Sequence, residues 1–485
     1  MGDKINMGGE CSNLALLSNP CELGRCVESA TIKSRSSGSS SMQFFLKLQP
    51  RSHFNGEPVS QVFAKVFINP STFDEKKYNQ FKQSQKFQQN VQDFSKIQLS
   101  LNALKFEMSI YGGIIEPIVT QRVCPFFTTV YSVGYNCSFQ DLKHLLRATT
   151  AVQIQMLETA LASTLITIKV HLKQGMQFSS DVKYCVILSK QSGDQTLRRI
   201  LKENYRRPLT PEIKKNWFKL LFQVAVGVYV LQLAGVAHND LHGNNILCPL
   251  SEKAQAMCIA IGMNPTTYYQ YSTHYIPNIY DFDRASFVNH PSPYKDTLEA
   301  KGTSYTSTVR ESQDFLRLVV HLFYDFFKGH KKKKPEYKAT AIKFYLMPLL
   351  RILARNEEVA AQIRSVASNS PFLIYNNNSL PAELFAQLTP MREVIHELAK
   401  LAEIQVSTSR PEPQPEEQLY FVDPSFFKDS QVQTAAVQDA VLPVFSKDKG
   451  VKGDVPPSKM RNVEAELTMQ LYDLEQMAFR QEQGK

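Results

Sequence analysis

Hydrophobic and polar positions follow two different periods along the chain, one before and one after residue 194. In the first part, short stretches rich in β-forming residues are separated by polar or Gly-bearing connections, which is typical of strands. These stretches are 42–48, 61–67, 126–133 and 183–188. In the second part, apolar residues recur at helical spacing. The helices predicted there are 211–235, 313–327 and 337–355. Strands followed by helices predict an α+β fold.

Three further segments have helical or mixed patterns. Residues 101–111 are helical in pattern, and the pair Gly112-Gly113 is expected to end that helix. The Gln- and Lys-rich stretch 74–98 reads as a helix or an insertion. An apolar face over 463–478 predicts a terminal helix, which we expect to pack back on the domain rather than bind a partner.

Shifts in composition divide the chain into four parts. An irregular extension, 1–24, precedes a β-rich lobe, 25–189, and a helical lobe, 190–405. Beyond these lies a stretch rich in Pro, Lys and Gly, which begins with the run 411–417. We therefore expect a linker and a helical tail over 406–485.

The composition is that of a globular protein with a substantial core, since 43% of its 485 residues are hydrophobic and 21% are charged. The net charge of +10 is spread along the chain and indicates a generally basic surface rather than a nucleic-acid site. The run of lysines at 331–334 fits a solvated loop. None of the eight cysteines forms a C-x-x-C pair, no signal-peptide core is present, and no apolar run reaches the ~20 residues needed to span a bilayer. We expect a reduced, intracellular protein without a transmembrane segment.

The ten residues from His238 to Leu247 read H-N-D-L-H-G-N-N-I-L. This is the spacing of the catalytic loop in protein kinases and their relatives, with Asp240 and Asn245 at the two chemical positions. In such a loop the carboxylate accepts a hydroxyl proton, and the amide holds a metal ion against the same phosphates.

A second carboxylate follows an apolar strand pattern in the run from Asn278 to Ala285, which reads N-I-Y-D-F-D-R-A. Asp281 occupies the position of the metal-binding Asp in D-F-G, although Asp283 replaces the Gly. The alternative is a turn residue at the end of a strand. Asp314, at the start of a predicted helix, is either a helix cap or a brace for the catalytic loop.

Phosphoryl transfer also needs positive charge over the nucleotide phosphates. Lys65 lies within an apolar strand pattern, where a lysine needs an acidic partner, and Glu107 in the helical stretch 101–111 is the best candidate. Lys47 is the competing lysine. The small-residue turn containing Gly38 and Ser39 can offer backbone N–H groups to phosphates, although it has a single glycine.

Residues 25–403 as a whole resemble the eukaryotic-type protein kinase superfamily. The residues of three motifs are similar to those of the serine/threonine protein kinases of large cytoplasmic DNA viruses, the iridovirus and poxvirus group. The motifs are H-N-D-L-H-x-N-N-I-L, Y-D-F-D-R-A and the run L-K-F-E-M-S-I-Y. The resemblance implies a bilobal kinase-like fold, with a β-rich N-lobe and a helical C-lobe.

The resemblance also implies which residues act in the site. Asp240 is the catalytic base, Asn245 and Asp281 are Mg²⁺ ligands with Mn²⁺ as an alternative ion, and Lys65 contacts the ATP phosphates with Glu107 as its pair. ATP binding is further assigned to Gly38, Ser39, Leu188 and Ser189, the last two at a hinge. The expected partners are protein substrates, virion proteins among them, in the host cytoplasm or packaged in the virion.

Two departures leave alternatives open. His242 stands where protein kinases usually carry a lysine, and an Asp-Leu-His version also occurs in aminoglycoside and choline kinase relatives, so a small-molecule phosphotransferase is one alternative. The poor Gly-rich loop favours a second, a pseudokinase scaffold. The stretch between Asn245 and Asp281 is long enough to imply an insertion, and no A-P-E motif follows Asp281. Phosphorylation is a candidate modification of four hydroxyl residues in that region. These are Thr303, Ser304, Thr306 and Ser307.

Overall fold

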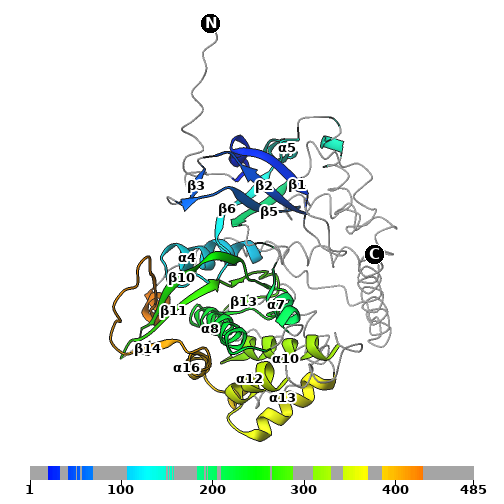
Figure 1. Ribbon diagram of the computed structural model, residues 1–485. Coiled ribbons are helices and arrows are strands. Elements are labelled where there is room, and N and C mark those ends of the chain that lie inside the picture. The colour runs from blue at the N-terminus through cyan, green and yellow to red at the C-terminus, as the bar shows by residue number, and fades with distance from the viewer. Residues whose placement is uncertain are drawn as a thin grey trace, which may run out of the picture. The chain divides into compact units, whose positions relative to one another are not determined.

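The structure is a computed structural model (Figure 1). With short gaps inside some ranges, it describes residues 20–32, 42–68, 106–157, 183–204, 209–287, 310–328, 342–369 and 385–429. Strands and helices both occur, and the predicted α+β class is confirmed at that level. The chain divides into two compact units. Of the described residues, unit 1 holds those in 20–68 and 131–189, and unit 2 holds those in 106–130 and 190–429.

Unit 1 is built on a five-stranded sheet with the order β1-β2-β5-β7-β6. The strands are β1 (Val27–Ile32), β2 (Met42–Leu48), β5 (Gln61–Ile68), β6 (Val130–Cys137) and β7 (Tyr184–Lys190). Alternate residues of β2, among them Phe44 and Leu46, are buried, as the two-residue period of a strand requires. They share a core with Leu142 and Leu145 of helix α5 (Phe139–Leu145). Smaller elements are η2 (Pro20–Arg25), β3 (His53–Phe54) and β4 (Glu57–Pro58).

The helix that carries Glu107 is longer than its glycines suggested. It is α-helical over 106–110, passes through the π-turn η4 (Tyr111–Ile115) and continues as α4 (Glu116–Thr120). The prediction that Gly112-Gly113 ends it is therefore wrong. A π-turn admits one extra residue per turn, and the neighbouring side chains of Ile114 and Ile115 are buried, so packing holds the helix together across the glycines.

Helices form most of unit 2, around α8 (Pro211–Leu233). Thr210 caps its first turn by accepting the Ile213 N–H at 3.2 Å, and Gly235, at φ 72°, follows its end. Its middle is buried on every side, which makes it the central helix of the unit. Figure 1 shows it beside β11, with α10 (Gln313–Lys328), α12 (Met347–Leu353), α13 (Glu357–Asn369) and α16 (Met391–Leu401) on its opposite side. Further helices of the unit are α7 (Leu197–Asn204), η5 (Ile342–Leu346) and α17 (Pro424–Asp429).

Unit 2 also contains a four-stranded sheet with the order β14-β11-β10-β15. The long antiparallel pair β10 (Leu250–Ile261) and β11 (Thr267–Tyr275) fills the stretch predicted to be an insertion. The outer strands, β14 (Gln405–Ser407) and β15 (Gln418–Val422), come from the segment predicted to be a linker. The boundary expected at residue 405 is therefore wrong, because the chain returns after α16 to complete this sheet.

Other predictions fared unequally. The strand at 42–48 and the helix starting at Pro211 are confirmed, whereas the strand predicted over 126–133 is displaced to β6, Val130–Cys137. The break after Ser189 coincides with a boundary between the units, but residues 106–130 belong to unit 2 rather than to an N-lobe. The stretch 74–98, the lysines at 331–334, the hydroxyl residues at 303–307 and the terminal helix at 463–478 lie outside the described residues.

Two properties predicted from composition are qualified by the structure. One helix among the described residues, α8, is long and apolar enough to cross a membrane, but 78% of its apolar window is buried in the structure, as in a core helix. Cys26 is disulfide-bonded, so the expectation of an entirely reduced chain does not hold for it. Among the residues that the structure describes, five cysteines are free and buried.

Candidate active site

Two short ladders bring the predicted site residues of unit 2 together. β8 (Val236–Ala237) and β9 (Ile246–Leu247) flank the loop that carries Asp240, and β9 pairs antiparallel with β12 (Asn278–Ile279). Ile246 lies opposite Ile279, and the Tyr280 N–H donates to the Asn245 carbonyl at 3.2 Å. Since the pair is antiparallel, Asn245 before β9 and Asp281 after β12 lie at the same end of the ladder.

Helix α10 braces the loop through Asp314. Its carboxylate is buried and accepts the backbone N–H groups of His238 at 2.7 Å and Asn239 at 3.0 Å. From the next turn, Arg317 donates to the Asn239 carbonyl. Asn239 has a φ of 61°, a left-handed conformation that asparagine tolerates better than most residues. Of the two roles predicted for Asp314, the contacts are those of the brace.

Asp240 is a buried carboxylate with a guanidinium on one side and an imidazole on the other. Its Oδ1 lies 3.1 Å from Nη1 of Arg284, and its Oδ2 lies 3.9 Å from Nε2 of His242. Burial raises its pKa, but Arg284 and three nearby imidazoles outweigh burial, so the pKa lies below its ordinary value. The imidazoles are those of His242, His238 and His321. The carboxylate is therefore ionised at neutral pH.

The amide of Asn245 is oriented by the same loop. It is buried, and its NH₂ group donates to the Asp240 carbonyl at 3.0 Å. This bond directs the amide oxygen away from the Asp240 carbonyl, and a carbonyl oxygen is a ligand that Mg²⁺ accepts.

Gly243, also in the loop, contacts α7 closely: an added Cβ would lie 3.0 Å from the Arg198 backbone nitrogen.

An aromatic stack connects the loop to the helix of Glu107. The buried ring of Phe282 lies between His238, at 4.8 Å between centroids, and Tyr111, at 5.4 Å and edge-on. The Tyr111 hydroxyl accepts the N–H of Asp281, at 3.0 Å, and Asp281 has a φ of 70°. Burial and then the nearby Glu107 raise the pKa of Tyr111 well above its usual value, so the phenol stays neutral.

Four carboxylates interact electrostatically around the segment after β12. Burial, followed by the charge of Asp281, raises the pKa of Asp283 well above its ordinary value; Glu107 and Asp240 add to the increase, and Arg284 opposes it. Within the described residues, no group of three or more His, Cys, Asp or Glu side chains has an arrangement that would hold a metal ion. A metal here would need ligands other than protein carboxylates alone.

The remaining predicted residues belong to unit 1 or lie outside the described part. Lys65 is partly buried on β5, opposite Gln43 of β2. Its competitor Lys47 is exposed and forms an ion pair with Glu28 at 2.9 Å. Ser189 and its neighbour Leu188 are buried near the end of β7. Gly38 and Ser39 lie outside the described residues.

Sequence reasoning missed three residues of the site, Arg284, Tyr111 and Arg317. Arg284 stood in the quoted run Y-D-F-D-R-A, where a cation near a buried carboxylate could have been suspected. Tyr111 is four residues after Glu107, the spacing of neighbours on one helical face. Arg317 carried no signal in the sequence, because its role depends on how α10 packs against the loop.

No protein-family profile matches this chain, and no curated protein matches it.

Proposed function

We propose that the protein is an ATP-dependent phosphotransferase of the protein kinase type, with protein serine or threonine hydroxyls as acceptors. The observations that support this most are that Asn245 and Asp281 lie at one end of the β9–β12 ladder and that the Asn245 amide donates to the Asp240 carbonyl. A proton acceptor beside two oxygen ligands is the arrangement that phosphoryl transfer needs. The proposal includes a bilobal kinase-like fold, with the sheet of unit 1 as the N-lobe and unit 2 as the C-lobe.

In the proposed reaction Asp240 orients the acceptor hydroxyl and takes its proton. The hydroxyl oxygen forms a bond to the γ-phosphorus of ATP, while the bond from that phosphorus to the bridging oxygen breaks and ADP leaves with the electron pair. Because Asp240 is ionised in the folded protein, it can accept the proton without first losing one. The brace from Asp314 fixes the loop from which Asp240 acts.

A Mg²⁺ ion fits this donor set. Mg²⁺ commonly binds one or two protein oxygens and completes its shell with water and substrate phosphates. The carboxylate of Asp281 and the amide oxygen of Asn245 would hold it, with Mn²⁺ as the alternative. When bound, the ion would offset negative charge on the phosphates and on the neighbouring carboxylates.

The proposal assigns the nucleotide to residues of unit 1. Lys65 would contact the phosphates and pair with Glu107; Gly38 and Ser39 would offer backbone N–H groups, and Leu188 and Ser189 would contact the nucleotide at the hinge. Lys47 is the weaker candidate for the phosphate-binding lysine because its side chain is 57% exposed, whereas Lys65 is partly buried. The resemblance of the motifs extends the proposal to a virus-encoded enzyme acting on host-cell or virion proteins.

Transfer of labelled phosphate from ATP by the full-length protein tests this function. With Mg²⁺ and a casein-like acceptor, the wild type should label protein, and Asp240→Ala should lower the rate by roughly 10²–10⁴-fold. Lys65→Met should lower it strongly, and Lys47→Met should leave it near the wild-type rate. Equal activity of wild type and Asp240→Ala would refute the enzymatic proposal in favour of a pseudokinase scaffold.

A small-molecule acceptor is the second candidate, and His242 favours it. Its imidazole stands 3.9 Å from the Asp240 carboxylate, where the protein kinases that this chain resembles usually carry a lysine. Parallel assays with casein, an amino sugar and choline separate the two. Labelling of the small molecules alone would replace the protein-kinase proposal with this one.

A further inference from the structure

The contacts of Arg284 differ from those of an ordinary surface arginine. Its Nη1 lies 3.1 Å from Oδ1 of Asp240, a carboxylate whose side chain is only 8% exposed, while the arginine itself is 39% exposed. A buried carboxylate needs compensating charge, and a guanidinium supplies it at any physiological pH. The ion pair therefore involves the carboxylate that takes the hydroxyl proton in the proposed reaction.

The backbone around Arg284 is fixed beside the catalytic loop. The Ala285 N–H donates to the Phe282 carbonyl at 3.1 Å, which closes a turn around Arg284. β13 (Ser286–Phe287) then pairs with β8, with Ser286 opposite Ala237, just before the catalytic loop begins. The Ser286 hydroxyl also accepts the Asn239 side-chain amide at 3.0 Å. Arg284 thus approaches Asp240 from a turn that is attached to the same loop.

The other side of the carboxylate carries imidazoles rather than a fixed charge. His242 accepts the Asn244 N–H at its Nδ1, at 3.2 Å, so the neutral ring carries its proton on Nε2, the atom nearest Oδ2 of Asp240. The ring of His321 lies 5.6 Å from that of His242, and burial followed by the charge of His242 lowers the pKa of His321 to about 3. Arg284 is therefore a permanent cation within ion-pair distance of Asp240.

We propose that Arg284 is a positioning residue for phosphoryl transfer, which holds Oδ1 of Asp240 and so turns Oδ2 toward the acceptor hydroxyl. The inference rests on the proposed function. The hydroxyl proton goes to Oδ2 as the oxygen bonds to the γ-phosphorus, and Arg284 keeps its protons throughout. Removing the guanidinium lets the carboxylate rotate and leaves its charge less compensated, so the chemical step slows while nucleotide binding is unchanged.

The test is steady-state kinetics of the full-length protein with ATP, Mg²⁺ and a casein-like acceptor. We expect Arg284→Gln to lower kcat roughly 10–100-fold, the usual effect of losing a group that orients a reactive ligand, with the KM for ATP within about twofold of wild type. Arg284→Lys should recover part of that loss, and added guanidinium should raise the kcat of Arg284→Ala but not that of wild type.

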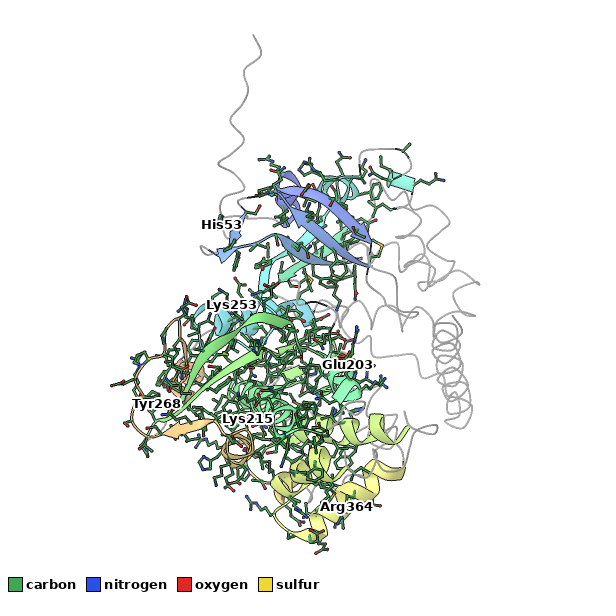
Figure 2. The ribbon with its side chains drawn as sticks, in the orientation of Figure 1. His53, Glu203, Lys215, Lys253, Tyr268 and Arg364 are labelled. Carbon is green, nitrogen blue, oxygen red and sulfur yellow. The ribbon has the colours of Figure 1, made fainter. Side chains whose placement is uncertain are left out.

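The matched control is Arg364→Gln. Arg364 is also 39% exposed and also forms an ion pair, with Glu357 at 2.8 Å. Figure 2 shows it on α13, away from the labelled Glu203 of α7, the helix that contacts the catalytic loop. This variant should keep the wild-type kcat.

Three outcomes would overturn the proposal: an unchanged kcat in Arg284→Gln, a raised kcat, which would make the ion pair an obstruction, or no guanidinium rescue. If Arg284→Gln does not fold, Arg284→Lys and the rescue of Arg284→Ala decide instead. Asp240→Asn, measured in the same assay, separates failure of the proposed function from failure of the role proposed for Arg284. If it is as active as wild type, the proposed function itself fails; if it is inactive while Arg284→Gln is fully active, only the role of Arg284 fails.

Discussion

The loop that carries Asp240 and the segment after β12 each contain an aspartate near Arg284, and the pKa values of the two carboxylates are shifted in opposite directions. Asp240 is the more deeply buried by solvent exposure, yet its pKa is lowered; Asp283 is partly buried, and its pKa is raised well above the ordinary value. Burial disfavours the charge of both. The difference lies in the neighbours, since cations and imidazoles surround the first and carboxylates surround the second. Exposure alone is a poor guide to which of the two is ionised.

The aromatic contact that joins the two regions should have the largest effect when it is removed. Phe282→Ala deletes a fully buried ring between His238 and Tyr111, and we expect a loss of about 3–5 kcal/mol in the free energy of unfolding. Denaturant unfolding of the full-length protein measures it. Phe421→Ala, which removes a 44% exposed ring on β15, is the control and should cost less than about 1 kcal/mol. Equal losses would mean that the stack does not hold the two regions together.

Neutralising the brace tests how far the catalytic loop depends on α10. Asp314→Asn keeps the side-chain shape, but an amide can accept well only one of the two N–H bonds from His238 and Asn239, so we expect a loss of about 2–3 kcal/mol and a lower kcat. In Asp141→Asn, the corresponding change in the partly exposed capping box of α5, the loss should be about 1 kcal/mol, without an effect on kcat. An unaltered kcat in Asp314→Asn would limit the brace to stability.

The opposite shifts of Asp240 and Asp283 predict opposite effects of the same substitution in metal-free protein. A lowered folded-state pKa gives stability that is present above the ordinary value and is lost as pH falls through the folded value, so Asp240→Asn should destabilise at pH 7. A raised folded-state pKa gives stability that is fully present below the ordinary value and is lost as pH rises through the folded value. Asp283→Asn should therefore stabilise at pH 7, by about 1–2 kcal/mol, and much less at pH 4.

Unfolding in the presence of a chelator at pH 4 and pH 7 measures both effects. Changes of the same sign for the two variants at pH 7 would contradict the comparison. Added Mg²⁺ should reduce the gain from Asp283→Asn, because a nearby cation offsets the repulsion between Asp283 and the other carboxylates.

The smallest effect is expected for a single hydroxyl. Tyr111→Phe removes the acceptor of the Asp281 N–H and should cost about 0.5–1.5 kcal/mol, with the ring stack on Phe282 kept. Tyr420→Phe, which removes an exposed hydroxyl bonded to Gln418 at 2.7 Å, is the control and should change stability by less than about 0.5 kcal/mol. A larger loss from Tyr420→Phe than from Tyr111→Phe would place the anchoring of Asp281 elsewhere.

The sequence pattern predicted those elements of the fold whose periodicity is visible within a single segment. The alternation of 42–48 and the Pro- and Gly-bounded apolar stripe of α8 were sufficient for those elements, because strand and helix periods are visible in a single segment. The glycines at 112–113 led to the wrong prediction that the helix ends there. Buried isoleucines beside them stabilise a π-turn that the helical pattern does not reveal. The strands β14 and β15 were missed because a segment of three or five residues has too little pattern to recognise without its partner.

The candidate site divides in the same way. Asp240, Asn245 and Asp281 could be found because their spacing follows from the loop that positions them. Arg284 and Arg317 could not, because which carboxylate or carbonyl they reach is set by the β8–β13 ladder and by the packing of α10. Spacing along the chain thus predicted the groups that the proposed reaction uses, and packing determined which groups contact them.

The pairing of β10 with β15 has a consequence for how the protein is made. Met257 lies opposite Gln418 and Ile261 opposite Val422, so this sheet joins segments that leave the ribosome far apart in time. Pairing between such distant segments is slow, and until it forms, one edge of β10 can pair with other chains. When Asp240, Asn245 and Asp281 have left the ribosome, the sheet that contains β10 therefore still lacks β15. A chaperone that shields β10 during synthesis should raise the yield of folded protein.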